Sequence, residues 1–208
     1  MGRTSTKADD KLIKTGIALA RAKGLSGFTI RQLCAKSKVN LGMFHYHFTD
    51  KDNFDQALLK AIYGDMLADI NINISDAASP KQNVRAVMFA IHGFIQKNRV
   101  LLSSLAGDVL SGNNSIVEFI SKNFTVHISI LRQQLARARK LGQLKTDDEF
   151  DAMLILIPPV ALPQGLLGLM ERMPLNMLQN IKVKFIKHKV ESGALKRMDL
   201  LLNAVFKD

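Results

Sequence analysis

The sequence of 208 residues has one cysteine, Cys34. A lone cysteine excludes an intramolecular disulfide and any metal site built from several cysteines, and it fits a reducing compartment. We expect Cys34 to be a buried thiol, with a redox switch as the alternative. The first residues lack the apolar run of a secretory signal peptide, so we expect a cytoplasmic protein.

Motifs of common enzyme classes are also missing. The sequence contains no glycine-rich phosphate loop, no His-Glu-x-x-His pair, no nucleophile elbow and no cluster of carboxylates. His45 and His47 are two residues apart, so on a helix they point to different faces and do not form a metal pair. We therefore expect a protein that is not an enzyme, with no metal and no cofactor.

One apolar segment is long enough to raise the question of a membrane span. Met153–Met170 is uncharged for eighteen residues, which reaches the lower length of a membrane-spanning helix. Its three prolines, its glutamine and its two glycines would leave backbone groups without partners in lipid. We expect a kinked helix that is buried or lies in an interface, and no membrane span.

Positive charge is abundant and unevenly distributed. The formal net charge is +11. Residues 1–52 contain ten Lys or Arg and four Asp, a net charge of +6, and the other three quarters of the chain have a net charge of +5. This balance predicts attraction to a polyanion through the N-terminal part, although total charge alone does not separate nucleic acid from a membrane surface or from simple solubility.

Apolar residues recur at helical spacing along the whole chain, and no stretch alternates with period two for long enough to form a sheet. The sequence therefore predicts an all-α protein of about nine helices. Predicted boundaries include Thr29 with Gln32 as a capping box, Asn40 as an N-cap, and Ser79-Pro80 as a helix start. We expect separate helices over about 80–95 and 100–110, one long helix over 115–141, and a last helix over about 193–206.

The segment from Phe28 to Phe48 has the lengths of a helix-turn-helix. Two short helices flank a tight three-residue turn, an arrangement that places the second helix in the major groove of DNA. The residues expected to pack this unit together are Ile30, Leu33, Cys34, Val39, Phe44 and Phe48. Those expected to face outward are Arg31, Leu41, Met43, His45 and His47.

This segment resembles the TetR family of bacterial transcriptional regulators. The residues that match the family pattern are Thr29, Arg31, Val39, Gly42, Phe44, His45, His47, Phe48 and Lys51, within a match over about residues 8–62. Two positions depart from it: Lys38 stands where the family often has Gly, and Cys34 where Ala is usual. If Lys38 is left-handed, it costs on the order of 1 kcal/mol.

The resemblance implies roles for nine residues. Arg31 would contact a base edge, preferably guanine, while Leu41, Gly42 and Met43 lie in the groove. Contacts to phosphates would come from Thr29, His45, Tyr46, His47 and Lys51. Three alternatives remain open: Arg31 as a solvated helix residue, Tyr46 as a packing residue, and His47 as a cap of the following turn.

For the rest of the chain, the resemblance implies a helical domain that senses a ligand and dimerises. We expect residues 1–52 to form the DNA-binding domain and residues 53–208 this second domain. A pocket for a small-molecule effector would be lined by His92, Phe119, Asn123, Phe124 and His127, with core packing as the alternative for each. The homodimer interface would combine Met153–Met170 with the stripe of the last helix, Leu195–Phe206, that contains Leu195, Met198, Leu201, Leu202 and Val205.

The functional hypothesis is a ligand-released repressor that binds a near-palindromic operator in double-stranded DNA as a homodimer. Activation in place of repression remains open. A nonspecific architectural DNA-binding protein is the first rival, because of the +11 charge. An enzyme with a vestigial DNA-binding segment is the second.

Overall fold

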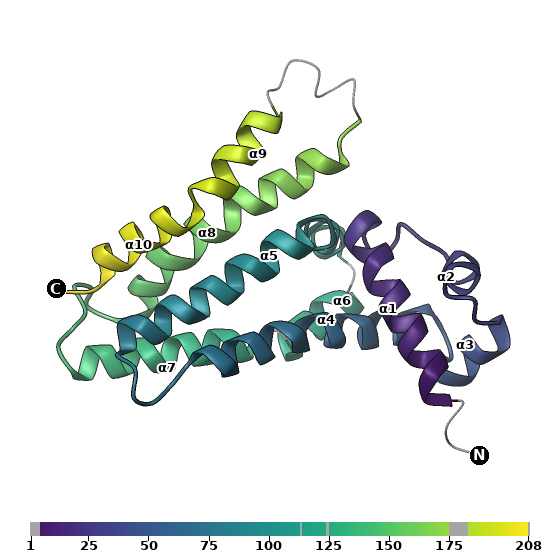
Figure 1. The fold of residues 1–208 in the computed structure, drawn as a ribbon, viewed down its shortest axis with the longest axis horizontal. Coiled ribbons are helices and arrows are strands. Elements are labelled where there is room, and N and C mark those ends of the chain that lie inside the picture. The colour runs from purple at the N-terminus through teal and green to yellow at the C-terminus, as the bar shows by residue number, and fades with distance from the viewer. Residues whose placement is uncertain (1–4, 113, 124, 175–182, 208) are drawn as a thin grey trace. The chain divides into compact units, whose positions relative to one another are not determined.

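The computed structural model describes residues 5–112, 114–123, 125–174 and 183–207, which form helices joined by loops, with no strand among them (Figure 1). This confirms the predicted all-α class. The helices are α1 (Ser5–Lys23), α2 (Ile30–Ser37), α3 (Leu41–Phe48), α4 (Lys51–Asn73), α5 (Pro80–Leu110), α6 (Asn114–Asn123), α7 (Val126–Lys140), α8 (Glu149–Arg172), α9 (Val183–Ser192) and α10 (Ala194–Val205).

The chain divides into two compact units, which we call the head unit and the body unit. The head unit contains Met1–Asp65 and Val100–Asn123, and the body unit contains Met66–Arg99 and Phe124–Asp208. Two long helices, α4 and α5, contribute to both units. In α5 the change of unit falls beside Asn98, whose φ of −117° and ψ of 15° interrupt the helical backbone.

Local sequence explains the geometry of α2 and α3. Thr29 Oγ1 accepts a hydrogen bond from the amide of Gln32 at 3.2 Å, and Gln32 Oε1 accepts one from the amide of Thr29 at 3.0 Å, which is the predicted capping box. Asn40 Oδ1 accepts from the amide of Met43 at 2.8 Å and begins α3. These caps satisfy backbone donors that the first turn of each helix leaves free.

The core of the head unit follows the predicted pattern in part, since Ile30, Val39 and Phe48 are half-buried. Leu33, Cys34 and Phe44 are buried, and burial raises the pKa of the Cys34 thiol. Phe44 contacts the rings of Phe48 and Phe54 at centroid distances of 5.8 and 5.6 Å. The thiol is therefore part of the core, as expected, and the aromatic cluster fixes α3 against the start of α4.

Lys38 closes α2 in the left-handed conformation, with φ 56° and ψ 38°. Its amide donates to the carbonyls of Ala35 and Cys34, so the residue ends one helix and turns the chain toward the next. A side chain at this φ and ψ places Cβ close to its own backbone, which is why glycine is favoured at such positions.

Replacing Lys38 with Gly is therefore expected to raise the free energy of unfolding by about 0.5–1 kcal/mol. Lys36→Gly is the matched control: Lys36 lies inside α2, where glycine should lower stability by about 1 kcal/mol. Urea denaturation of both variants measures the change. A loss of stability in Lys38→Gly would show that the lysine side chain contributes more than its backbone strain costs.

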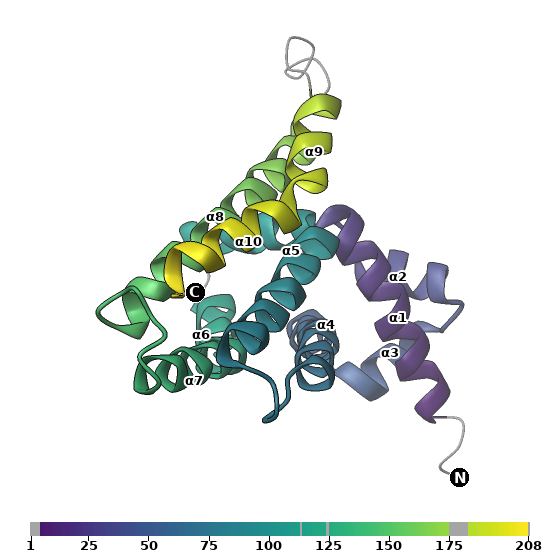
Figure 2. The ribbon, with the colours of Figure 1, turned by 60° about the vertical axis from the view of Figure 1, so that its left-hand side comes forward.

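In the body unit, α10 lies alongside α8 in both views (Figure 1, Figure 2). Leu156, Val160, Leu167 and Met170 are buried on one face of α8, and Met198, Leu202 and Val205 are buried on α10. A polar pair joins other helices of this unit, since the buried Asn83 Nδ2 donates to Gln134 Oε1 at 3.1 Å.

Helix α8 contains Pro158, Pro159 and Pro163 in its interior and is capped by Asp148, whose side chain accepts from the amide of Asp151 at 2.8 Å. Each proline lacks an amide hydrogen, so the carbonyl four residues earlier has no intrahelical donor. By length and hydropathy α8 also meets the criteria of a membrane span, and 33% of its most apolar window is buried.

One predicted boundary is confirmed and another is wrong. The two helices predicted over about 80–95 and 100–110 are the two parts of α5, which the non-helical backbone of Asn98 separates. The long helix predicted over 115–141 is two helices, α6 and α7, and Thr125 is the N-cap of the second. A short interruption preserves the apolar period that predicts a helix, so it leaves little trace in the sequence.

Candidate nucleic-acid interface

An exposed surface surrounds the turn between α2 and α3. Arg31, Leu41, Gly42 and Tyr46 are exposed there, and Tyr46 is 75% exposed. That exposure excludes the alternative of Tyr46 as a core packing residue. Met43 is half-buried, whereas Leu41 is exposed. The apolar surface predicted for α3 is therefore presented mainly by Leu41.

Gly42 has no steric reason to be glycine within this chain. A Cβ added there would lie 3.5 Å from Asn40 Oδ1, an ordinary contact, and Gly42 is not among the residues of positive φ. The fold would therefore accept a side chain at the first turn of α3. A glycine that the fold does not require fits a position where another molecule approaches the backbone closely.

The two histidines of α3 differ. His45 is exposed, and its Nδ1 lies 2.8 Å from the carbonyl oxygen of Thr49. Because a carbonyl only accepts, Nδ1 must donate, and Nε2 is the atom left to contact a ligand. His47 is half-buried, and its Nε2 is buried without a hydrogen-bond partner. The alternative of His47 as a cap of the next turn therefore gains no support from its Nε2.

Several basic residues that the sequence reasoning left out of the predicted contacts are exposed on the head unit. Lys36 is on the last turn of α2 and Lys38 is in the turn itself, and both are exposed. Others are exposed on α1: Lys7, Lys11 and Lys14. The excess of positive charge in residues 1–52 could have indicated that these lysines also contact DNA.

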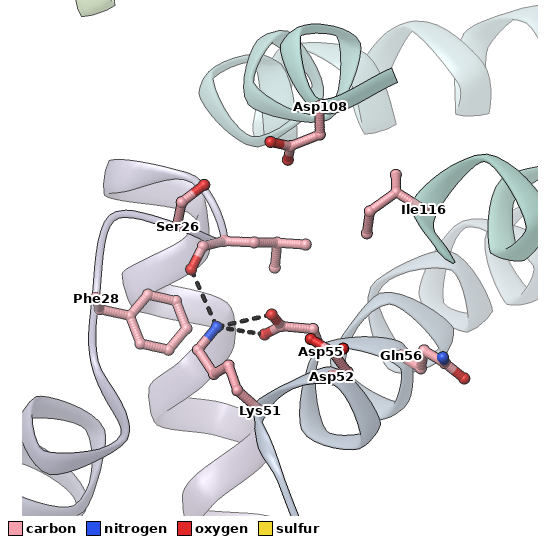
Figure 3. Close-up of a pocket in the computed structure, with 9 residues that line it drawn as sticks. Ser26, Phe28, Lys51, Asp52, Asp55, Gln56, Asp108 and Ile116 are labelled. Atoms are coloured by element: carbon pink, nitrogen blue, oxygen red, sulfur yellow. Dashed lines mark hydrogen bonds and ion pairs between the residues drawn. The ribbon is translucent and has the colours of Figure 1, made fainter. Parts of the chain in front are cut away.

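Lys51 is held inside the head unit. Its Nζ donates to both carboxylate oxygens of Asp55 at 2.7 Å and to the carbonyl of Leu25 at 3.0 Å (Figure 3). It also lies 4.3 Å from the centroid of the Phe28 ring, a cation–π contact. These contacts join the start of α4 to the loop between α1 and α2. The structure does not test the phosphate contact predicted for Lys51. Because Asp55 already compensates the charge of Lys51, we expect its main role to lie within the head unit.

A cavity of about 280 Å³ opens beside this ion pair. Three carboxylates line it, from Asp52 and Asp55 on α4 and Asp108 on α5 (Figure 3). Burial raises the pKa of Asp55 to about 6, in opposition to the hydrogen bond from Lys51. This grouping was not expected from the sequence, because Asp108 is far from the other two along the chain.

Lys51→Ala is expected to lower the free energy of unfolding by about 1–3 kcal/mol, because it leaves the carboxylate of Asp55 partly buried without its cation. We expect it to change the salt dependence of DNA binding little. Lys36→Ala, the exposed control, should leave stability unchanged within about 0.5 kcal/mol and lower the salt slope by about 0.9 if Lys36 contacts a phosphate.

Urea denaturation and binding of a mixed-sequence duplex at several salt concentrations measure both quantities. Unchanged stability together with a slope lowered by about one in Lys51→Ala would return the phosphate role to Lys51.

The residues predicted to line an effector pocket belong to both units. His92 and His127 are in the body unit, and burial lowers the pKa of both imidazoles, that of His127 to about 4. Phe119 and Asn123 are in the head unit, where Asn123 Nδ2 donates to the carbonyl of Phe119 at 2.8 Å. Phe124 lies outside the described residues. The shared pocket stays a prediction.

An apolar stripe remains exposed on α8, on the face opposite to its buried residues. It consists of Phe150, Leu154, Leu162, Leu166 and Leu169. The last helix differs from the prediction: Met198, Leu202 and Val205 are buried against their own chain, while Leu195 is exposed and Leu201 is half-buried. The predicted stripe of α10 is therefore mostly used within one chain.

Comparisons with known proteins agree on the fold. No family model matches the sequence. The nucleoid occlusion factor SlmA of Sodalis glossinidius is 22% identical over 150 residues, which are 72% of this chain and 75% of that protein. A TetR transcription regulator from Haloarcula marismortui has a TM-score of 0.74 at 13% identity, and the match covers 97% of this chain and 100% of the other.

Two further solved structures are similar. The transcriptional regulator FadR of Bacillus subtilis, in complex with stearoyl-CoA, has a TM-score of 0.68 at 14% identity, covering 94% of this chain and 98% of the other. A TetR-family transcriptional regulator of Agrobacterium tumefaciens has the same TM-score at 15% identity, covering 93% and 98%. The resemblance to the TetR family therefore extends from the helix-turn-helix segment to the fold of nearly the whole chain.

Proposed function

We propose that this protein is a sequence-specific, DNA-binding transcriptional regulator of the cytoplasm that works as a homodimer. The observation that carries the proposal is the α2–turn–α3 unit. Both of its helices are capped, its turn is fixed at Lys38, and it presents an exposed surface that includes Arg31 and Gly42. In a helix-turn-helix, such a unit places the second helix in the major groove.

Within this proposal, residues 1–52 supply the DNA contacts and residues 53–208 the dimer and the effector response. Arg31 contacts a base edge, and Leu41, Gly42 and Met43 lie against the groove. Thr29, His45, Tyr46 and His47 contact phosphates. The exposed hydroxyl of Thr29 can still donate, because its oxygen acts as acceptor in the capping box.

The homodimer is proposed to form through the exposed stripe of α8. Leu154, Leu162 and Leu166 are more than half exposed in one chain, and a contiguous apolar face of this kind marks an interaction surface. A second copy of the chain offers the same face, so a two-fold axis buries both stripes. Two heads related by that axis require a near-palindromic operator.

The effector response is proposed as a population shift. A small molecule that binds the body better in one conformation changes the spacing of the two heads and lowers the affinity for the operator. The regulator would then act as a repressor that its ligand releases. The SlmA likeness favours no other activity for this chain, because at 22% identity it supports the fold and not a shared role.

Selection of duplexes from a random-sequence library tests the proposal. The expected result is enrichment of one near-palindromic sequence whose half-sites are separated by about one helical turn or a multiple of it. Recovery of sequences with no common motif would contradict it and would favour a nonspecific DNA-binding protein.

A further inference from the structure

One polar side chain of the body unit is buried with no partner. Gln164, on α8, is 1% exposed, and neither its Nε2 nor its Oε1 has a hydrogen bond. An amide in this position forfeits the bonds that it makes with water, so a buried pair of unused donor and acceptor atoms requires an explanation. Gln164 lines a cavity formed by α5, α8, α9 and α10.

The cavity combines an apolar wall with groups that bind anions. Its apolar residues are Pro159, Val160, Pro163, Val190 and Ala194. Its polar groups are Gln164, the buried His92 of α5 and the guanidinium of Arg197 on α10. Burial lowers the pKa of His92, and the charge of Arg197 lowers it further while Glu191 opposes the shift. The neutral imidazole, which has one N–H to donate, is therefore favoured.

Arg197 currently holds the end of α9. Its Nη1 donates to the carbonyl of Lys189 at 3.1 Å and its Nη2 donates to the carbonyl of Val190. None of the described residues of α9 is buried, and the helix is also tied by the ion pair of Arg99 with Glu191 at 2.9 Å. Helix α9 is therefore held over the cavity by polar contacts, with little apolar packing.

We propose that this cavity binds the carboxylate of a small aliphatic organic acid. Once α9 has moved, Arg197, the Gln164 amide and the His92 N–H are donors for the two carboxylate oxygens, and the apolar wall accepts the alkyl chain. The empty cavity has a volume of about 10 Å³, which is room for one water-sized group.

An acid enters only when Arg197 exchanges the carbonyls of α9 for the carboxylate, which moves α9. The action of the acid as the effector rests on the proposed function, whereas the binding of the acid to this cavity does not.

Thermal unfolding without DNA tests the binding. The probes are sodium acetate, propionate, butyrate and hexanoate, each compared with sodium chloride at equal ionic strength. For the wild type we expect a saturable rise of the midpoint temperature, about 5 °C or more at roughly a hundred times the dissociation constant. No rise with any of the four acids would overturn the proposal.

Gln164→Met is the variant, and Gln133→Met, at an exposed position of α7, is the matched control. Gln164→Met should lose the response to acid, and without acid it should unfold at a higher temperature than the wild type, because the unpaired amide is gone. The control should keep the full response. If the acids raise the midpoint temperature of Gln164→Met as much as that of the wild type, the effect is nonspecific salt binding and the proposal is wrong. If Gln164→Met without acid unfolds at a lower temperature than the wild type, the Gln164 amide already has hydrogen-bond partners, which also contradicts the proposal.

If Gln164→Met does not fold, Arg197→Met provides the second measurement, since it keeps the aliphatic stem and removes the cation. It must lose the response as well. Retention of the wild-type shift by Arg197→Met would overturn the assignment. Because no DNA is present, failure of these assays leaves the DNA-binding proposal intact.

Discussion

A protein carrying both Leu162→Glu and Leu166→Glu is expected to be a folded monomer. The two side chains are 69% and 57% exposed and lie four residues apart on one face of α8, so glutamates there remain solvated in a single chain. In the proposed dimer, four carboxylates would be desolvated near the two-fold axis. We expect the dimer dissociation constant to rise by at least about a thousandfold, a loss of roughly 4 kcal/mol.

Light scattering and sedimentation over a range of concentrations measure this change. Ile72→Glu is the control, since Ile72 is 79% exposed on α4 and lies outside the proposed interface. It should leave the oligomeric state unchanged. Leu201→Glu tests the surface less cleanly, because Leu201 is half-buried against its own chain. A double variant that stays dimeric at the wild-type affinity would place the interface elsewhere.

Arg31→Ala is expected to weaken binding to the selected operator by about 5- to 150-fold, or 1–3 kcal/mol, with the loss confined to one base pair in each half-site. The guanidinium is exposed, and the capping bonds of α2 involve Thr29 and Gln32, so the fold should not change. A bidentate contact discriminates between bases because the wrong base leaves donors unpaired.

The measurement is the affinity of wild type, Arg31→Ala and Arg31→Lys for the operator and for each of its single-base variants. Arg31→Lys keeps the charge but loses the planar fork, so it should lose most of the discrimination at that base pair. An equal loss on operator and on random DNA would reassign Arg31 to the phosphate backbone.

What was predictable from the sequence was local. The Thr29–Gln32 box and the Asn40 cap depend on residues within three positions of one another, and the structure contains both. The left-handed conformation of Lys38 was only a condition drawn from the family's glycine at that position. The apolar period likewise predicted the buried Leu33 and Phe44. Short-range chemistry of this kind leaves an unambiguous pattern in the sequence.

What was missed depends on residues far apart in the chain. Lys51 matched a family pattern, and nothing near it in the sequence shows that Nζ donates to the carbonyl of Leu25. Met198 and Leu202 carry the same apolar stripe whether the stripe packs against α8 of its own chain or against a partner. Gln164 appeared as one polar residue in an apolar segment, and its unpaired amide became visible only when α5, α9 and α10 were placed around it.

The most direct test of sequence-specific binding is the ratio of two dissociation constants at one salt concentration, for the selected near-palindrome and for a scrambled duplex of equal length and composition. Equal salt is essential, because the +11 charge attracts any duplex. A regulator that reads bases through Arg31 and α3 should bind the selected duplex about a thousandfold more tightly or better. Dissociation constants within a few-fold of each other would contradict the account and would leave a nonspecific, electrostatic DNA-binding protein.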